Sequence, residues 1–298
     1  MLSFLPPAVR GVLTSLLIGV NTLVVFGCMI PFALLKRLLP FEGLHAALDR
    51  VLMGLASTWV AVNNGWIVAV NPRAAWDVRG TDGLHARGWY LVSSNHQTWV
   101  DILVLQRVFH GRIPFLKFFL KRELIWVPVI GLAWWALDFP FMKRGKGRQS
   151  RDADLATTRA ACEKFKRIPT SVINFVEGTR FTEAKRAAQQ SPYRHLLKPK
   201  IGGLGIALAT MGEQFEQLLD VTIAYPGGTP DFWDLLCGRV GAVTVRVQAR
   251  AIPADVLGVD PVGDPAGRQR IGGWVGAQWA EKDALLDTLL PGPGDDAA

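Results

Sequence analysis

The chain has 298 residues, enough to bury a full hydrophobic core, and 33 Lys and Arg against 25 Asp and Glu give it a net charge of +8. The positive charge suits an anionic partner, while 11 Trp and a hydrophobic content of 50% favour a membrane surface over nucleic acid, for which the sequence has no binding motif. Three scattered cysteines, Cys28, Cys162 and Cys237, lack zinc-ligand spacing and indicate neither a disulfide framework nor a metal site.

The N-terminal part of the chain is apolar. Between Arg10 and Lys36 lie 25 uncharged residues, long enough for a helix that crosses a bilayer. A second uncharged run, of 22 residues, lies between Arg50 and Arg73, but its asparagines and tryptophans fit a spanning helix, a re-entrant one or one that lies in the interface. We expect residues 1–72 to form a membrane-embedded helical segment with one or two hydrophobic helices. Basic residues flank the first run on both sides, so charge gives no orientation.

An α/β pattern follows and predicts a catalytic domain over residues 73–290, with 291–298 as a disordered tail. Short apolar runs predict strands at 90–94, 171–176, 219–225 and 242–252. Helical patterns are expected at 101–109, 152–167 and 203–211. This alternation indicates an α/β fold with a mixed sheet flanked by helices, preceded by the N-terminal hydrophobic helices.

Two further segments complete the expected domain. The uncharged stretch 124–137 contains three tryptophans and is either core or a second membrane-contacting patch. Glycines and prolines between 258 and 267 are typical of a linker, after which 274–290 is expected to form a terminal helix.

A histidine and an aspartate stand five positions apart just after the first predicted strand, in Asn95-His96-Gln97-Thr98-Trp99-Val100-Asp101. If both were helical, their side chains would point about 140° apart. If His96 lies in the turn and Asp101 opens the next helix, the carboxylate can bind one imidazole nitrogen and leave the other as a general base. The alternative is that His96 caps the turn and Asp101 only favours a helix N-terminus.

A second polar cluster, Glu177-Gly178-Thr179-Arg180, follows the strand predicted at 171–176. Arg180 can bind a phosphate bidentately, and Glu177 and Thr179 can position hydroxyl groups or the loop itself. The alternative is a solvated turn with a Glu–Arg pair. Further basic residues that suit phosphate or anionic lipid, or else are ordinary surface charge, are Lys143, Arg144, Lys146, Arg148, Lys198 and Lys200.

Taken in order, these residues resemble the glycerophospholipid acyltransferase family, which is typified by 1-acylglycerol-3-phosphate acyltransferase. His96 and Asp101 match its His-x4-Asp motif. The other three blocks are matched by Phe141-Met142-Lys143-Arg144, by Glu177-Gly178-Thr179-Arg180 and by the apolar run 221–226 that ends in Pro226. Within the family, 175–182, 197–200 and 279–283 resemble the lysocardiolipin acyltransferase-like branch with its bacterial members.

The resemblance implies acyl transfer from a thioester donor, acyl-CoA or acyl-carrier protein, to the sn-2 hydroxyl of lysophosphatidic acid, which makes phosphatidic acid. It implies that His96 is the base and that Asp101 orients it. The substrate-binding residues that it implies are Arg144, Glu177, Gly178, Thr179, Arg180 and Lys200. No metal or cofactor is expected besides the thioester co-substrate.

The resemblance also implies contact with membrane phospholipid at the inner (cytoplasmic) membrane, with the catalytic domain on the cytoplasmic face, where thioester donors are found. Nucleic acid is not an expected partner. Lysophosphatidylglycerol or lysocardiolipin is the alternative acceptor. From another class, the alternative is a non-catalytic membrane-binding protein on the same fold.

Overall fold

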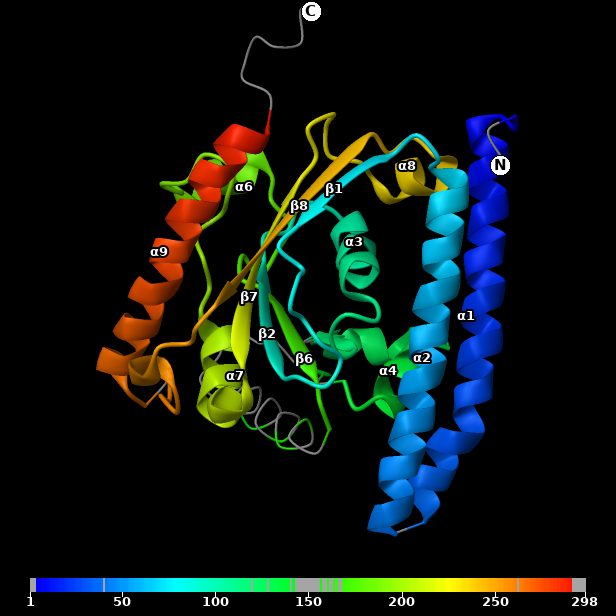
Figure 1. Cartoon of the computed structure of the whole chain (residues 1–298), viewed down its shortest axis with the longest axis horizontal. Helices are drawn as coiled ribbons and strands as arrows, with labels where there is room; N and C mark the ends of the chain where they lie inside the picture. Colours follow the sequence, from blue (N-terminus) through cyan, green and yellow to red (C-terminus); the bar gives the residue numbers. More distant parts are fainter. Residues whose placement is uncertain are drawn as a thin grey trace, which may run out of the picture.

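Two long helices, α1 (Pro7–Leu38) and α2 (Glu42–Val70), form an antiparallel hairpin along one side of the molecule (Figure 1). This computed structural model describes residues 4–39, 41–118, 120–127, 129–139, 141–142, 156, 160, 163, 165, 168–261 and 263–290. Inside the hairpin, Asn21 Nδ2 donates to Asn63 Oδ1 over 2.9 Å. Trp59 Nε1 donates to Thr22 Oγ1 over 3.0 Å. Polar groups of the two uncharged runs are thus satisfied between the helices.

The outer face of the hairpin is apolar. Both helices are long and apolar enough to cross a membrane, and only 22% and 28% of their most apolar windows is buried. Large exposed side chains of α1 are Val9, Val12, Leu16, Val20, Leu23, Val24, Ile30, Leu34, Leu35 and Leu38. A continuous apolar face of this extent is typical of a surface that contacts lipid or another protein.

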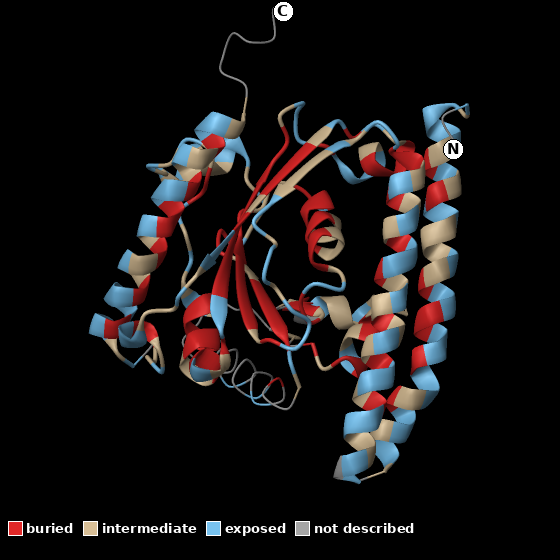
Figure 2. Cartoon of the chain, in the orientation of Figure 1, coloured by how far each residue is buried: buried red, intermediate tan, exposed pale blue. Residues whose placement is uncertain are grey.

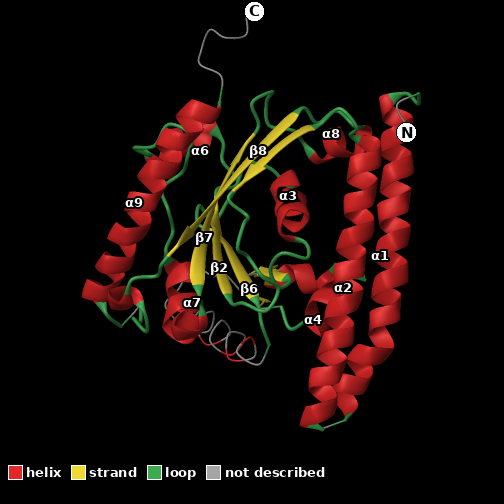
Figure 3. Cartoon of the chain, viewed as in Figure 1, coloured by secondary structure: helices red, strands yellow, loops and turns green. Residues whose placement is uncertain are grey.

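A six-stranded sheet forms the centre of the molecule, with the strand order β1-β8-β7-β2-β6-β3 (Figure 3). Its strands are β1 (Ala75–Arg79), β2 (Tyr90–Ser94), β3 (Leu116–Phe118), β6 (Ser171–Phe175), β7 (Gln217–Ala224) and β8 (Ala242–Arg250). β7 and β8 are antiparallel, and the other neighbouring pairs are parallel. The predicted mixed sheet is therefore confirmed. Because β2, β6 and β7 are parallel, their carboxyl ends meet at one edge of the sheet.

Helices cover both faces of the sheet (Figure 2). α3 (Val100–Phe109) packs on one face in a hydrophobic core that Ile67 of α2 also joins. α7 (Gly202–Met211) and α9 (Pro265–Leu289) enclose a second core on the other face. A third core joins the hairpin to α4 (Ile130–Ala136), and α8 (Phe232–Cys237) also contacts both helices of the hairpin. The hairpin is thus packed onto the sheet domain, and the predicted division at residues 72 and 73 stays a prediction.

Several short elements were not predicted from the sequence. They are β1, β3, α4, α8, the small sheet of β4 (Leu120–Lys121) and β5 (Phe141–Met142), α6 (Glu183–Gln189), and the 3-10 helices η1 (Arg122–Trp126), η2 (Gly212–Gln214) and η3 (Ala254–Val256). The predicted tail 291–298 and most of the predicted helix 152–167 lie outside the described residues. Those of the latter that are described, at 156, 160, 163 and 165, are helical.

The C-terminal helix begins at Pro265 and not at Trp274 as predicted. The side chain of Asp264 accepts a hydrogen bond from Gly267 N–H over 2.9 Å and caps the helix. Pro265 occupies the first helical position, where its missing N–H is not needed. Residues whose composition predicted a linker thus form the first turn of α9.

The apolar stretch 124–137 contributes both to the core and to the surface. Ala133, Ala136 and Leu137 are buried in the core that joins α4 to the hairpin. Trp126 is 84% exposed, and Trp135 is 42% exposed. The surface part has the composition predicted for a membrane-contacting patch, and that contact stays a prediction.

Candidate active site

His96 and Asp101 meet where β2 passes into α3. β2 ends at Ser94 and α3 begins at Val100, so His96 lies in the turn and Asp101 in the first turn of the helix. His96 Nδ1 lies 2.9 Å from Asp101 Oδ2. This is the arrangement that the five-residue spacing requires if the two side chains are to touch.

Both oxygens of the buried Asp101 carboxylate accept hydrogen bonds. Oδ2 accepts from the backbone N–H of Gln97 over 2.6 Å and of Thr98 over 2.9 Å. Oδ1 accepts from the hydroxyl of Tyr225 over 2.6 Å. Because Asp101 meets donors at both oxygens, it acts as an ionised acceptor, and the proton of the His96 ring belongs on Nδ1. That tautomer leaves a lone pair on Nε2.

The plane of the His96 ring is fixed by stacking. The ring lies on Phe175 with a centroid distance of 3.9 Å and an interplanar angle of 16°. The His96 side chain is 12% exposed, and no described residue forms a hydrogen bond with Nε2. The imidazole is therefore held at one nitrogen and on one face, while the other nitrogen is available to a substrate.

The turn that carries His96 is fastened to β7. Asn95 Nδ2 donates to Ile223 O over 2.9 Å, and Asn95 Oδ1 accepts from Ile223 N–H over 2.8 Å. Thr98 Oγ1 donates to Pro230 O over 2.7 Å. The turn that carries His96 is thus set by contacts with residues more than 120 positions later in the chain.

Glu177 binds the backbone of the turn that carries His96. Its carboxylate is fully buried, and it accepts from His96 N–H at Oε1 over 2.8 Å and from Leu197 N–H at Oε2 over 3.0 Å. Burial raises the pKa of Glu177 to about 7 although the two backbone N–H groups lower it, and of the nearby charges Asp101 raises the pKa while Lys282 lowers it. Glu177 thus joins two loops through the backbone N–H groups bound at its two oxygens, and its predicted contact with the substrate stays a prediction.

The segment after Glu177 closes over the same turn. Phe181 N–H donates to His96 O over 2.7 Å, and Lys200 N–H donates to Val176 O over 2.7 Å. Gly178 has a φ of +66°, in the left-handed region, and a Cβ there would lie 3.1 Å from Lys200 Cδ. The backbone conformation therefore favours glycine at this position, and a Cβ would in addition require the Lys200 side chain to shift by a few tenths of an ångström.

Three basic side chains, those of Arg180, Lys185 and Lys200, lie beside the turn that carries His96. The guanidinium of Arg180 lies 5.0 Å above the ring of Trp99, a cation–π contact that joins the two loops. Lys185 Nζ donates to Thr179 Oγ1 over 3.0 Å and to Arg180 O over 2.8 Å. Arg180 and Lys200 are exposed and form no ion pair with any residue that the structure describes. The arrangement suits an anionic group such as a phosphate.

The structure brings most of the predicted site residues together, and it adds others. His96, Asp101 and the Glu177–Arg180 loop adjoin one another, and Lys200 lies over Gly178. Arg144 lies outside the described residues. Within the described part of the chain no group of three His, Cys, Asp or Glu side chains could hold a metal ion. The residues that sequence reasoning missed are Asn95, Trp99, Phe175, Lys185 and Tyr225, of which only Tyr225 had a signal, its place at the end of the fourth block.

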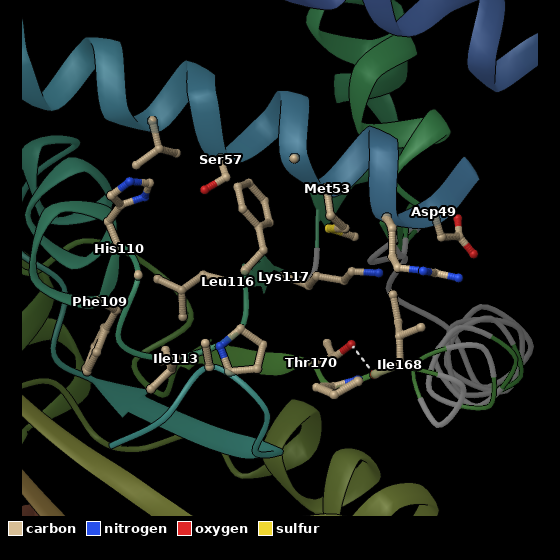
Figure 4. A pocket seen from close by; sticks show the side chains of 18 of the residues that line it. Asp49, Met53, Ser57, Phe109, His110, Ile113, Leu116, Lys117, Ile168 and Thr170 are labelled. Atoms are coloured by element: carbon tan, nitrogen blue, oxygen red, sulfur yellow. Dashed lines mark hydrogen bonds between the residues drawn. The ribbon is translucent and has the colours of Figure 1, made fainter. Parts of the chain in front are cut away.

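A cavity of about 480 Å³ opens between α2 and the start of β3 (Figure 4). Met53 and Ser57 of α2 form one wall, and Ile113, Leu116 and Ile168 lie opposite. It adjoins the amino ends of β3 and β6, whereas His96 follows the carboxyl end of β2. Phe118, which follows the lining residue Lys117, begins a row of stacked rings: its centroid lies 6.2 Å from that of Phe175, and Phe175 stacks on His96.

Comparison with known proteins relates this site to an enzyme family. Residues 75–226, which carry both loops and Tyr225, match the family model described as Acyltransferase. The 1-acyl-sn-glycerol-3-phosphate acyltransferase 2 of Brassica oleracea is 30% identical over 213 residues, which cover 66% of this chain and 50% of that protein. The 1-acyl-sn-glycerol-3-phosphate acyltransferase gamma of Mus musculus is 29% identical over 212 residues, which cover 66% and 52%. The chain spans about half the length of these relatives.

The fold is also similar to that of a solved structure. The crystal structure of the 1-acyl-sn-glycerophosphate (LPA) acyltransferase PlsC from Thermotoga maritima matches with a TM-score of 0.53 at 17% identity, covering 93% of this chain and 97% of that chain. At this identity the likeness concerns the fold alone. The family match covers more than half of the 298 residues and includes His96 and Asp101. The chain therefore belongs to the acyltransferase family.

Proposed function

We propose that this protein transfers a fatty acyl group from acyl-CoA or acyl-carrier protein to the sn-2 hydroxyl of lysophosphatidic acid. The observation that carries the proposal is the 2.9 Å contact of His96 Nδ1 with Asp101 Oδ2, which leaves Nε2 as a base. The basic side chains of Arg180, Lys185 and Lys200 lie beside it and are called the basic rim below. The names of the relatives, 1-acyl-sn-glycerol-3-phosphate acyltransferases, support this choice of acceptor.

In this mechanism His96 Nε2 takes the proton of the sn-2 hydroxyl while the hydroxyl oxygen attacks the thioester carbonyl carbon. Asp101 holds Nδ1–H and stabilises the imidazolium that forms. The tetrahedral intermediate then collapses, the carbon–sulfur bond breaks, and the imidazolium returns its proton to the departing sulfur. The products are the ester, phosphatidic acid, and the free thiol of the donor.

The basic rim supplies the contact with the acceptor phosphate. Arg180 can form two parallel hydrogen bonds to phosphate oxygens, and Lys200 adds a point charge from the other side of Gly178. Trp99 orients the Arg180 guanidinium by stacking beneath it. Thr179 acts through Lys185, because its hydroxyl accepts from the Lys185 ammonium.

The cavity between α2 and β3 supplies apolar space for an acyl chain. Its volume of about 480 Å³ lies within the usual range for ligand sites, roughly 300–1,000 Å³. Its walls are mainly apolar, and Phe118, next in the chain to the lining residue Lys117, begins the row of stacked rings that ends at His96. An acyl chain that follows this row would bring its carbonyl group to the base.

The hairpin is proposed to lie in the plane of the membrane surface. A Cβ at Gly11 would lie 2.7 Å from Cys237 Sγ of α8, and Lys36 Nζ bonds Asp138, just beyond α4, at 2.5 Å. Gly11 and Lys36 are ~38 Å apart along a helix, more than the ~30 Å hydrocarbon core. If α1 crossed the bilayer, the sheet domain beside it would have to enter the lipid. A helix in the interface instead puts the apolar face of α1 in lipid and leaves the sheet domain in water.

We assign the domain to the cytoplasmic face of the inner membrane because the thioester donors are found on that side. The test uses the purified full-length chain, labelled acyl-CoA and a panel of acceptors: lysophosphatidic acid, lysophosphatidylglycerol, lysocardiolipin and monoacylglycerol. The proposal requires the highest kcat/KM with lysophosphatidic acid. A higher value with another lysophospholipid would favour the alternative acceptor, and no turnover with any acceptor or with an acyl-carrier-protein donor would favour a non-catalytic membrane protein.

A further inference from the structure

The C-terminal helix α9 lies outside the residues 75–226 that match the family, yet it reaches the loops of the active site (Figure 1). It packs on the face of the sheet opposite α3, so the sheet separates it from the helix that carries Asp101. A helix in this place would be expected only to cover the core. Its polar side chains, however, also bind the loop at 194–197.

A chain of hydrogen bonds runs from α9 to the backbone of His96. The buried indole of Trp279 donates from Nε1 to Leu197 O over 2.9 Å. The N–H of the same residue, Leu197, donates to Glu177 Oε2 over 3.0 Å, and Glu177 Oε1 accepts from His96 N–H over 2.8 Å. Each link fixes the next, so the position of Trp279 sets that of the carboxylate behind His96.

The next turn of α9 holds the residues just before Leu197. Asp283 accepts from Arg194 N–H at Oδ2 and from His195 N–H at Oδ1, each over 2.8 Å. Two consecutive backbone groups are thus bound by a single carboxylate. The segment 194–197 therefore takes its position from α9 at both of its ends.

Lys282, between these two residues, brings a buried charge under the same edge of the sheet. Its side chain is fully buried, and Nζ donates to Val221 O over 2.5 Å and pairs with Asp220 Oδ1 at 2.6 Å. Val221 lies opposite Ser94 of β2, just before the catalytic turn. The Lys282 charge lowers the pKa of Glu177, whereas the Asp101 charge raises it.

We propose that α9 is part of the catalytic apparatus, with Trp279, Lys282 and Asp283 as positioning residues that hold Glu177 and, through it, the backbone of His96. None of the three touches the reacting atoms. This inference rests on the proposed acyl transfer. It means that His96 is aligned by residues outside the segment 75–226 that matches the family.

A purely structural role makes a different prediction. Trp279 also packs in the core with Ile271 and Val275. If α9 only covers this core, substitutions will lower the thermal stability, and the folded fraction will keep its full turnover number. If α9 aligns the base, the turnover number will fall in protein that remains folded.

The first experiment compares Asp283→Asn and Trp279→Phe with Glu281→Gln in the full-length chain. Glu281 is on the same turn, but its exposed carboxylate points to Arg250 at 2.6 Å and takes no part in the chain of bonds. For each variant, kcat, KM and Tm are measured at a temperature well below unfolding. Asp283→Glu, which keeps both oxygens, tests rescue.

We expect Asp283→Asn and Trp279→Phe to lower kcat by ~10- to 100-fold with KM changed by less than about threefold, as for small displacements of a catalytic group. Asp283→Glu should recover part of the loss, and Glu281→Gln should keep the wild-type kcat. Wild-type kcat in the folded Asp283 and Trp279 variants would overturn the inference. Wild-type protein that acylates no acceptor would refute the proposed function itself, which is a separate result.

The second experiment follows the pH profile of Lys282→Met and of Lys282→Met combined with Asp220→Asn. The charged or titratable groups around Glu177 are Asp101 from α3, Lys282 from α9 and His96 in the turn. Loss of the Lys282 charge favours protonation of Glu177, whose Oε1 binds the His96 N–H, so the acid limb of kcat should move to higher pH. The double variant removes both charges of the Lys282–Asp220 pair. It should therefore fold, and its acid limb should move less than that of Lys282→Met. Acid limbs unchanged from wild type in both variants would exclude an electrostatic role for Lys282.

Discussion

Tyr225 donates its hydroxyl proton to Asp101 Oδ1 over 2.6 Å, although the two residues are 124 positions apart in the chain. The phenol stands at the carboxyl end of β7, and the carboxylate lies in the first turn of α3. This bond completes the set of donors around Asp101. It also explains why the fourth sequence block ends where it does, since a residue at the end of β7 can reach into the His96 turn.

Tyr225→Phe should therefore impair catalysis while preserving the ring in the core. Removal of one hydrogen bond to a charged acceptor costs about 1.5–3 kcal/mol, so we expect roughly a tenfold or larger fall in kcat. Tyr90→Phe is the matched control, because Tyr90 is buried in the same core and its hydroxyl accepts a hydrogen bond from the backbone N–H of His85, away from Asp101. Equal kcat values for the two variants would show that the Tyr225 hydroxyl does not support the His96–Asp101 pair.

His96→Ala should lower kcat by several orders of magnitude, since a positioned general base contributes on the order of 10²–10⁴-fold. Tm and recovery in the membrane fraction should stay near the wild-type values, because the ring is partly exposed. His85→Ala, which removes an exposed imidazole next to Glu216, is the control. Turnover within about threefold of the wild type would reject His96 as the base.

Arg180→Ala should weaken the use of lysophosphatidic acid far more than the use of monoacylglycerol. Only the phosphorylated acceptor loses a charge-assisted bidentate contact. Arg180→Lys should recover little, because the ammonium keeps the charge and lacks the planar fork. Arg186→Ala removes a guanidinium that pairs with Glu183 on α6 and serves as the control. Proportional losses in kcat/KM on both acceptors would instead mean that Arg180 supports the loop.

The stability of the protein should fall as the pH rises between about 4.5 and 7. Burial raises the pKa of Glu177 to about 7 from 4.5, so across this window the folded state retains a proton that the unfolded state has released. The loss amounts to about 3 kcal/mol over the window. Glu177→Gln cannot titrate and should show a flatter pH dependence, even if its Tm is lower throughout. Tm measured at several pH values for both proteins decides this, and parallel curves would contradict the assignment.

Gly54→Phe should shift the acyl-chain preference toward shorter chains. Gly54 lines the cavity from α2, and a Cβ at this position meets no atom within 4 Å, so a large side chain can enter the cavity. Gly65→Phe adds the same ring to α2 at a position that also has open space and is not part of the cavity wall. kcat/KM for donors of increasing length is measured in both variants. An identical chain-length profile in the two would place the acyl chain elsewhere.

The sequence was most informative where one strand ends in a polar motif. The short apolar runs before His96 and Glu177 predicted two strands, and parallel pairing of β2 and β6 puts both polar clusters at one edge. By contrast, β3 is only three residues long, and β1 contains the charged residues Asp77 and Arg79 and no buried residue, whereas β2 is buried throughout. The start of α9 was misplaced because its capping residue, Asp264, lies among glycines and prolines that resemble a linker.

The roles inside the site were harder to predict than the elements. Glu177 belongs to a polar motif and was assigned to the substrate, but its burial depends on Leu197, which comes 20 positions later. The Trp99 contact with Arg180 likewise joins two loops that are distant in sequence. Local spacing contains no information on such pairs, because they arise only when the sheet brings separate loops together.

The two bonds of the Glu177 carboxylate have a consequence for how acceptor preference can change. The chain leaves the site at Gly178 and is bound again at Leu197 by the same carboxylate, with the Lys200 N–H bond to Val176 O beside it. The segment between Gly178 and Leu197, which includes α6 and Lys185, is therefore held together where it begins and ends. Insertions, deletions or grafts between Phe181, which bonds His96 O, and Arg194, which bonds Asp283, can alter the surface proposed to meet the lipid headgroup without breaking either bond. This part of the segment is therefore the natural place to exchange headgroup selectivity between related enzymes.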